Sequence, residues 1–205
     1  MDRVIASGRG VMRVTYHQFW LIEADQHSRP RIRATNGLVG TAPGAALIHT
    51  GIHTGVVALS VQASDSAPES VEVDGWDEVA EVSLTAPVGR VRPAALDADT
   101  DPFPELTVAG PGDYRVRVHA RGRDTMIDGV SAEPVEDYLI MVWPQAPGSE
   151  QIFKQTDRYG AEMRISVARA PVVPDPSPTD EDLRLARVEA FLRTVREQHL
   201  NPPAE

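Results

Sequence analysis

The stretch that decides the fold is Gly112-Asp113-Tyr114-Arg115-Val116-Arg117-Val118-His119-Ala120-Arg121. Its even positions from 114 to 120 are apolar or aromatic, and its odd positions from 115 to 121 carry arginine or histidine. Strict alternation places the two sets of side chains on opposite faces of a β-strand. Turn residues at Gly110–Asp113 start this strand. The pattern therefore predicts a strand with one face packed inward and one face turned to water.

Further short apolar segments, separated by glycine and proline, predict additional strands. Val56–Val61 and Val79–Leu84 have strand composition. Tyr138–Trp143 is apolar on both faces, which predicts a central or doubly covered strand, and Pro144 ends it. No helix of the βαβ kind appears between these segments, which argues against parallel pairing. The sequence predicts an all-β fold, an antiparallel β-sandwich of jelly-roll-like type, followed by a C-terminal amphipathic α-helix.

The domain organisation follows from composition near the C-terminus. Residues 1–170 are the predicted sandwich domain, and residues 171–178 contain four prolines, which predict a stiff linker. Residues 179–200 predict a helix, with Thr179 as its N-cap. Its apolar positions at helical spacing are a candidate surface for docking on the sandwich, on a second copy or on a partner: Leu185, Val188, Leu192 and Val195.

A second informative stretch is Val14-Thr15-Tyr16-His17-Gln18-Phe19-Trp20-Leu21-Ile22. It contains three aromatic residues and no glycine or proline, which is typical of a strand. Alternation along the whole stretch puts apolar side chains on both faces, so we expect a continuous strand covered on both sides. On this interpretation His17 and Gln18 make hydrogen bonds that define the fold and do not perform catalysis.

The charge of the chain is strongly uneven. The net charge is −10, and residues 61–111 hold eleven acidic residues against two arginines. An acidic chain is poorly suited to bind a nucleic acid backbone directly, whereas it suits a basic protein partner. Ordinary acidic solubility is the alternative interpretation. The candidate partner-binding residues are Asp74, Asp77, Glu78, Asp97, Asp99, Asp101 and Glu105.

One basic stripe runs through Arg115, Arg117, His119, Arg121 and Arg123. Side chains at alternate strand positions lie about 7 Å apart, a spacing that suits phosphates or an acidic strip of a partner. The alternative is a solvated face whose arginines pair with acids on the neighbouring strands. The abundance of acids in residues 61–111 favours this second interpretation.

Metal binding has little support in the sequence. The chain has no cysteine, which excludes disulfides and thiolate ligands. His49 and His53 are four residues apart, and on an extended strand they lie about 13 Å from each other unless Gly51 bends the chain. Because no third ligand follows at a recognisable spacing, we predict no metal and no cofactor. A metal-dependent enzyme that also uses His17 or His119 remains an alternative.

Catalysis has no recognisable motif either. The chain has no G-x-S-x-G elbow, no Walker loop and no G-x-G-x-x-G. Glu133, Glu136 and Asp137 precede the strand at Tyr138, but an acidic loop is more typical of a solvated surface. We predict no catalytic residue and no enzymatic activity. No apolar run reaches the roughly 18–20 residues of a membrane span, and no signal-peptide core is present, so the expected location is the cytoplasm.

Three short motifs carry a family resemblance: Tyr16-His17-Gln18-Phe19, Gly112-Asp113-Tyr114 and Tyr138-Leu139-Ile140. In this order, the chain resembles the competence protein J family of DNA-entry nuclease inhibitors over residues 10–145. The resemblance implies a small cytoplasmic β-sandwich that performs no chemistry and masks the basic cleft of a nuclease. No inhibitory residue is carried over from the family, so the acidic residues above rest on charge alone.

Two other function classes stay open at this point. A sandwich that binds a small ligand or carbohydrate could use Tyr16, Trp20 and Trp143 as a stacking surface, provided that the rings are exposed in a concavity. A structural or assembly protein would use the helix at 179–200 as its connector.

Overall fold

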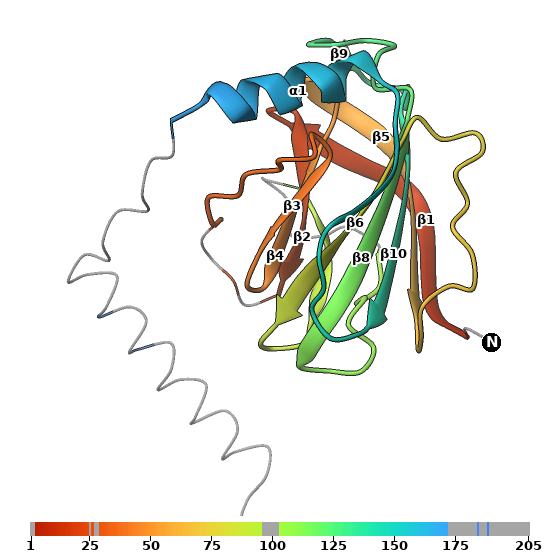
Figure 1. The fold of residues 1–205 in the computed structure, drawn as a ribbon, viewed down its shortest axis with the longest axis vertical. Coiled ribbons are helices and arrows are strands. Elements are labelled where there is room, and N and C mark those ends of the chain that lie inside the picture. Colours follow the sequence, from red (N-terminus) through yellow and green to blue (C-terminus); the bar gives the residue numbers. More distant parts are fainter. Residues whose placement is uncertain are drawn as a thin grey trace, which may run out of the picture. The chain divides into compact units, whose positions relative to one another are not determined.

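The computed structural model describes residues 3–24, 26, 29–95, 103–171, 184 and 188. The chain divides into two compact units, Met1–Ala170 and Pro171–Glu205, and the first contains the β-strands and one α-helix (Figure 1). No helix within the described ranges is long and apolar enough to cross a membrane. The elements are β1 Val4–Thr15, β2 Gln18–Glu23, β3 Val39–Ala42, β4 Ala45–His49, β5 Thr54–Ser64, β6 Glu78–Ala86, β7 Val91–Ala94, β8 Gly112–Arg121, β9 Val130–Ser131, β10 Asp137–Pro144, β11 Gln151–Gln155 and α1 Arg158–Arg169.

All described strands belong to one mixed sheet that is folded into a sandwich. The strand order is β11-β6-β8-β10-β5-β1-β2-β4-β3, with β7 beside β2 and β9 beside β5. Figure 1 shows β2, β3 and β4 in one layer and β6, β8 and β10 in the other. The sheet does not close into a barrel, since β3 and β11 end it without pairing with each other. The predicted all-β sandwich is therefore confirmed.

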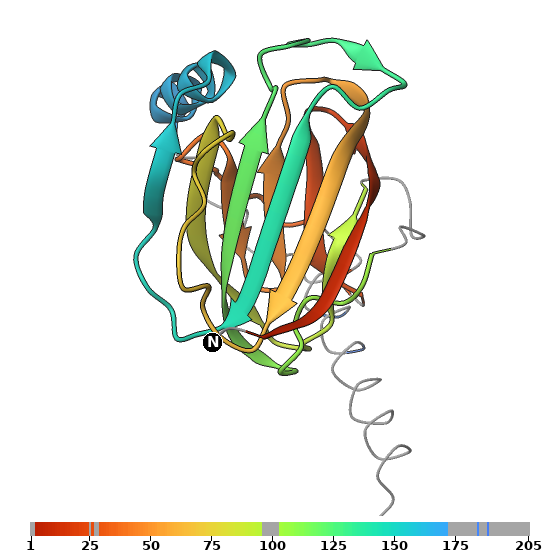
Figure 2. The same cartoon turned by 90° about the vertical axis from the view of Figure 1, so that its right-hand side faces the viewer.

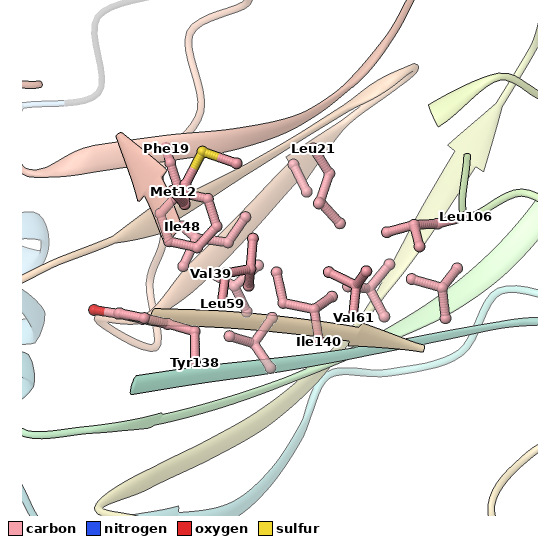
Figure 3. Close-up of a cluster of buried hydrophobic side chains, with 14 of the residues drawn as sticks. Met12, Phe19, Leu21, Val39, Ile48, Leu59, Val61, Leu106, Tyr138 and Ile140 are labelled. Atoms are coloured by element: carbon pink, nitrogen blue, oxygen red, sulfur yellow. The ribbon is translucent and has the colours of Figure 1, made fainter. Parts of the chain in front are cut away.

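One hydrophobic core fills the space between the layers. Met12, Phe19 and Leu21 come from β1 and β2, and they meet Leu59 and Ile140 from β5 and β10 (Figure 3). All five are at most 1% exposed. Full burial of side chains of this size contributes about 1.5–3 kcal/mol each, so the core is the main source of stability.

The four strands predicted from alternation and composition are confirmed as β5, β6, β8 and β10. The expectation that pairing is antiparallel throughout is wrong for β10, which runs parallel to β5 with Tyr138 opposite Leu59 and Ile140 opposite Val61. β9 is also parallel to β5. The chain leaves β5 and reaches β10 by way of β6, β7, β8 and β9, and the described residues of this connection, 65–95 and 103–136, contain no crossover helix. The sequence therefore lacks the helical pattern that usually signals a parallel pair.

The stretch Val14–Ile22 is a hairpin, and the predicted continuous strand is wrong. β1 ends at Thr15, β2 begins at Gln18, and these two residues pair across a two-residue turn. Tyr16 and His17 both have left-handed backbones, with φ of 56° and 60°. Two-residue hairpins favour such turns but usually place asparagine or glycine in them. Because neither turn residue is a usual turn former, composition alone indicates a strand.

The outer face of β8 is buried, contrary to the expectation that it faces water. Arg115, Arg117 and His119 are at most 5% exposed. The predicted pairing with acids on the neighbouring strand holds, since Glu81 on β6 accepts from both arginines at 2.8 Å. The Trp76 ring packs over His119, and further contacts come from the backbone at positions 70, 148 and 149. This part of the basic stripe is therefore not a binding surface for phosphates.

The helix α1 follows β11 and was not expected from the sequence. Its N-cap is Asp157, whose side chain accepts a hydrogen bond from the Gly160 backbone N–H at 2.7 Å. The predicted helix at 179–200 lies outside the described residues except for Arg184 and Val188, which are helical. Val188 is 48% exposed. Self-association through this segment stays a prediction.

Candidate protein-binding surface

Three segments meet at one end of the sheet and form what we call the loop end. They are the β1–β2 turn at Tyr16-His17, the segment 50–53 between β4 and β5, and the loop 122–136 that contains β9. In Figures 1 and 2 the loop end is at the top, beside β9. Residues 50–53 and 122–136 lie far apart in the sequence, so the sheet topology is what brings them together.

Hydrogen bonds and ring contacts centred on His17 join the three segments. The His17 backbone N–H donates to the His53 carbonyl at 3.1 Å, and the Thr50 N–H donates to the His17 carbonyl at 2.9 Å. The His17 Nε2 lies 2.9 Å from a carboxylate oxygen of Asp128. The imidazole stacks on the Tyr159 ring of α1 at a centroid distance of 5.8 Å. The turn is therefore fixed from several sides.

Unfavourable backbone conformations are concentrated at the loop end. Among the described residues, three other than glycine have positive φ: Tyr16, His17 and Asp128. A non-glycine residue in this region is strained by on the order of 1–3 kcal/mol, and such residues cluster at functional sites. His17 contacts Asp128, and Tyr16 precedes His17 in the same turn. The strain is thus confined to one surface, where the surrounding contacts hold it.

Large apolar side chains are exposed at the same end. Tyr16 is 64% exposed, Met126 38% and Val130 73%. Val130 pairs with Thr54 at the start of β5, and Met126 packs against Gly129 in its own loop. Tyr16 contacts the His53 ring edge-on at 5.4 Å. Aromatic and apolar groups presented on a fixed scaffold are typical anchors of protein–protein interfaces.

Beneath the loop end, Arg123 is fully buried. Its guanidinium donates to both carboxylate oxygens of Asp157 at 2.6 and 3.0 Å, and to the carbonyls of Gly37 and His49 at 2.9 and 3.4 Å. The Arg123 carbonyl lies 1.9 Å from where a Cβ of Gly51 would be, so only glycine fits at position 51. This network ties the 122–136 loop to α1 and to the 50–53 segment.

Glu136 forms the second buried group of the base. Its carboxylate accepts from the backbone N–H groups of Gly51 and Ile52 at 3.1 and 2.6 Å, and from the Tyr138 hydroxyl at 2.6 Å. Burial raises the pKa of the Glu136 carboxyl and the pKa of the Tyr138 hydroxyl. Burial also lowers the pKa of the nearby His49 to about 4, which keeps this imidazole neutral at pH 7.

Glu78 completes the base from the side of β6. It accepts a hydrogen bond from Arg164 of α1 at 3.1 Å and lies 3.9 Å from the Arg123 guanidinium. Its side chain is 1% exposed. Burial, together with the negative charge of Asp157, raises the pKa of Glu78 to about 7. Two carboxyl groups therefore share the positive charge of one buried arginine.

These buried groups lie beneath the surface of the loop end and are not exposed on it. Arg123, Glu136 and Tyr138 are at most 2% exposed, and their polar atoms bond to one another and to the backbone. A substrate would have to displace this network to reach them. We conclude that the accessible part of the loop end consists of its turn residues and apolar tips.

The residues of the family motifs are divided between the loop end and the strands of the sandwich. Tyr16 and His17 form the tip of the loop end, whereas Phe19 is in the core at 0% exposure and Gln18 begins β2. The segment Gly112-Asp113-Tyr114 begins β8, and β8 ends at Arg121, just before the loop end. The Tyr114 hydroxyl donates to the Gly110 carbonyl at 2.6 Å, which closes the turn before β8.

The acidic residues proposed from charge are found in different environments. Asp74 and Glu105 are exposed, Asp77 is half-buried and Glu78 is buried, so Glu78 does not belong to any outer surface. Glu105 pairs with Arg90 at 3.0 Å. The Asp77 carboxylate accepts from the Gly122 N–H at 2.9 Å, at the base of the loop end. The remaining three, Asp97, Asp99 and Asp101, lie outside the described residues.

Neither alternative site from the sequence is assembled. In the part of the chain that the structure describes, no group of three or more histidine, aspartate or glutamate side chains is arranged to hold a metal ion. His119 is on the outer face of β8, separate from His17 and His53. Trp20 and Trp143 are 3% and 2% exposed, so they offer no stacking surface for a carbohydrate.

Sequence reasoning missed Met126, Asp128 and Val130. One signal was present, because Asp128-Gly129 is a dipeptide that often occupies tight turns. The exposure of Met126 and Val130 could not be read from the sequence, since no local pattern in this loop distinguishes an exposed apolar residue from a buried one.

Comparison with known proteins gives a likeness of fold. No protein-family model and no curated protein matches the chain. A structure described as crocagin biosynthetic gene J is 20% identical, with a TM-score of 0.44 over 71% of this chain and 99% of that chain. ComJ from Bacillus subtilis, described as an inhibitor of the DNA degrading activity of NucA, is 15% identical, with a TM-score of 0.45 and the same coverage. Both likenesses concern the fold alone.

Proposed function

We propose that this chain is a non-catalytic protein-binding module, of the nuclease-inhibitor or immunity-protein type, that masks a basic partner with an acidic surface. The observation that carries the proposal is the 64% exposure of Tyr16 on a strained turn that is fixed by contacts on several sides. A large ring held in one place loses little conformational entropy on binding, so it is a favourable anchor for a partner protein.

Charge supports a basic partner. The net charge of the chain is −10, and residues 124–133 contain three acids, Asp124, Asp128 and Glu133, with no arginine or lysine. All three are exposed. Opposite charges across an interface accelerate association and select against acidic partners. The exposed acids therefore lie beside the apolar tips that would contact the partner.

The nuclease in this proposal comes from the sequence motifs of the competence protein J family, whose member ComJ is described as an inhibitor of NucA. The partner would be a nuclease or another basic protein whose nucleic-acid site is covered when the loop end binds. A cytoplasmic location remains part of the proposal.

An affinity experiment with matched baits tests this function. Immobilised full-length chain, its Tyr16→Ala variant and its Val4→Ala variant are incubated with a lysate of the source cells. Val4 is the control, because it is 48% exposed but lies at the opposite end of β1. We expect a basic protein that binds the unchanged chain and Val4→Ala and is at least tenfold depleted on Tyr16→Ala.

The retained protein is then purified, and its binding is measured by calorimetry. A nuclease is also assayed on plasmid DNA with increasing amounts of the chain. We expect a saturable complex and, for a nuclease, loss of DNA cleavage at the binding stoichiometry. The absence of any basic protein, or equal retention on Tyr16→Ala, would contradict the proposed function.

A further inference from the structure

We infer that the Asp128 carboxylate is the group that receives an arginine side chain of the basic partner. The inference rests on the proposed function and deepens it, since it assigns the residue that recognises the partner's positive charge.

Asp128 projects from the loop end on a fixed backbone. Its side chain is 80% exposed, and its φ is 59°. The Asp128 N–H donates to the Gly51 carbonyl at 3.0 Å, which attaches the tip of the loop to the buried base. The carboxylate is therefore presented to solvent at a defined place and does not move with a long flexible side chain.

The two oxygens of the carboxylate differ in their environment. Oδ1 lies 2.9 Å from the Nε2 of His17, while Oδ2 has no hydrogen-bond or ion-pair partner among the residues that the structure describes. The opposite ring nitrogen of His17 is 3.3 Å from the Thr50 carbonyl, and its ring stacks on Tyr159, so the imidazole itself is held in place. His17 thus orients the carboxylate and leaves one oxygen available to a donor from outside.

Two exposed side chains stand close to Asp128 and to its partner His17 along the chain. Val130 is two residues further along the same loop, and Tyr16 is the immediate neighbour of His17 in the β1–β2 turn. When a partner covers these side chains, water is excluded and an ion pair at Asp128 becomes stronger. Arginine suits the site better than lysine, because a planar guanidinium can donate to Oδ2 while its flat face stacks on an aromatic ring such as Tyr16.

Binding of a small probe tests the inference without the partner. N-acetyl-arginine amide is titrated into the isotope-labelled full chain and followed by amide chemical shifts in two-dimensional NMR. We expect saturable shifts confined to residues 15–17, 50–54 and 127–131, and smaller shifts with N-acetyl-lysine amide. The Asp128→Asn variant, which keeps the size of the side chain and tolerates the left-handed backbone, should lose these shifts. Equal shifts in wild type and Asp128→Asn would overturn the inference.

The complex with the captured partner supplies the second test. We expect Asp128→Asn to weaken binding 30-fold to 100-fold and to reduce its dependence on salt. Glu133→Gln is the matched control, because it removes an exposed acid from the same loop, and it should change affinity less than threefold. Wild-type affinity of Asp128→Asn combined with lost binding of Tyr16→Ala would overturn this inference and leave the proposed function intact. Unchanged binding of both variants would overturn the proposed function as well.

Discussion

Two clusters of buried ion pairs contain arginines from one stripe in the sequence, and the surfaces near them differ. Arg115 and Arg117 share Glu81 beneath segments that cover the outer face of β8. Arg123 holds Asp157 beneath the loop end, where Tyr16 and other apolar tips are exposed. Both clusters fix the backbone around them, and an exposed ring lies near each, since Phe153, which is 38% exposed, packs over the Arg117 guanidinium at 5.2 Å. The Tyr16 ring differs because it is carried by a turn with a left-handed backbone. Buried ion pairs therefore indicate where the fold is rigid, and the strained turn with its 64% exposed Tyr16 marks the surface that we propose binds a partner.

The largest expected effect is on the base of the loop end. Arg123→Ala leaves the Asp157 and Glu78 carboxylates buried without their shared cation. Removing one partner of a buried ion pair costs about 3–5 kcal/mol, and we expect this variant to be at the upper end of that range in urea unfolding. Arg121→Ala is the control, because its side chain is 50% exposed and pairs with Asp137 at the surface. A loss below about 1 kcal/mol, typical of surface pairs, would show that Arg123 is not structural.

The cluster of Arg115, Arg117 and Glu81 should affect stability but not binding. Glu81→Gln removes the charge that Arg115 and Arg117 share, and we expect the free energy of unfolding to fall by about 3 kcal/mol. Under conditions in which the variant is folded, its affinity for the captured partner should equal that of the wild type. Weakened binding by a folded Glu81→Gln variant would mean that the outer face of β8 takes part in recognition.

Glu78 makes the stability of the base depend on pH. Its folded pKa is raised from 4.5 to about 7, so the folded protein binds this proton more tightly than the unfolded chain. The resulting stability is fully present below pH 4.5 and is lost as the pH rises through 7, by up to about 3 kcal/mol. Glu78→Gln removes this pH-dependent loss of stability. The free energy of unfolding of the variant minus that of the wild type should therefore increase between pH 5 and pH 7.5. A constant difference across that range would contradict the assignment.

A substitution at Tyr16 distinguishes the backbone strain of the β1–β2 turn from the role of the ring in binding, and its expected effect on stability is smaller. Tyr16→Asn places a residue that tolerates the left-handed conformation in the β1–β2 turn, and we expect a gain of about 1 kcal/mol in unfolding free energy. The same change should weaken partner binding at least tenfold, because it removes the exposed ring. A thermal melt and a calorimetric titration on the same sample measure both quantities. A stabilised variant that binds normally would show that Tyr16 has no role in recognition.

The sequence predicted the sandwich because two patterns are direct consequences of strand geometry. One is the alternation at 114–121, and the other is the presence of apolar residues on both strand faces at 138–143. It did not predict the parallel pairing of β10 with β5, since topology depends on the partner strand and leaves no local pattern. The hairpin at Tyr16-His17 was hidden because its turn residues have strand composition. The loop end itself was missed because it joins segments from positions 16, 50 and 128, which only the folded chain brings together.

Hydrogen–deuterium exchange on the complex with the captured partner tests the central claim most directly. If the loop end is the binding surface, amides in residues 14–18, 50–55 and 124–136 become protected when the partner binds, while the exchange of β6 and β11 is unchanged. Protection confined to other strands, with residues 14–18 and 124–136 exchanging as in the free chain, would contradict it.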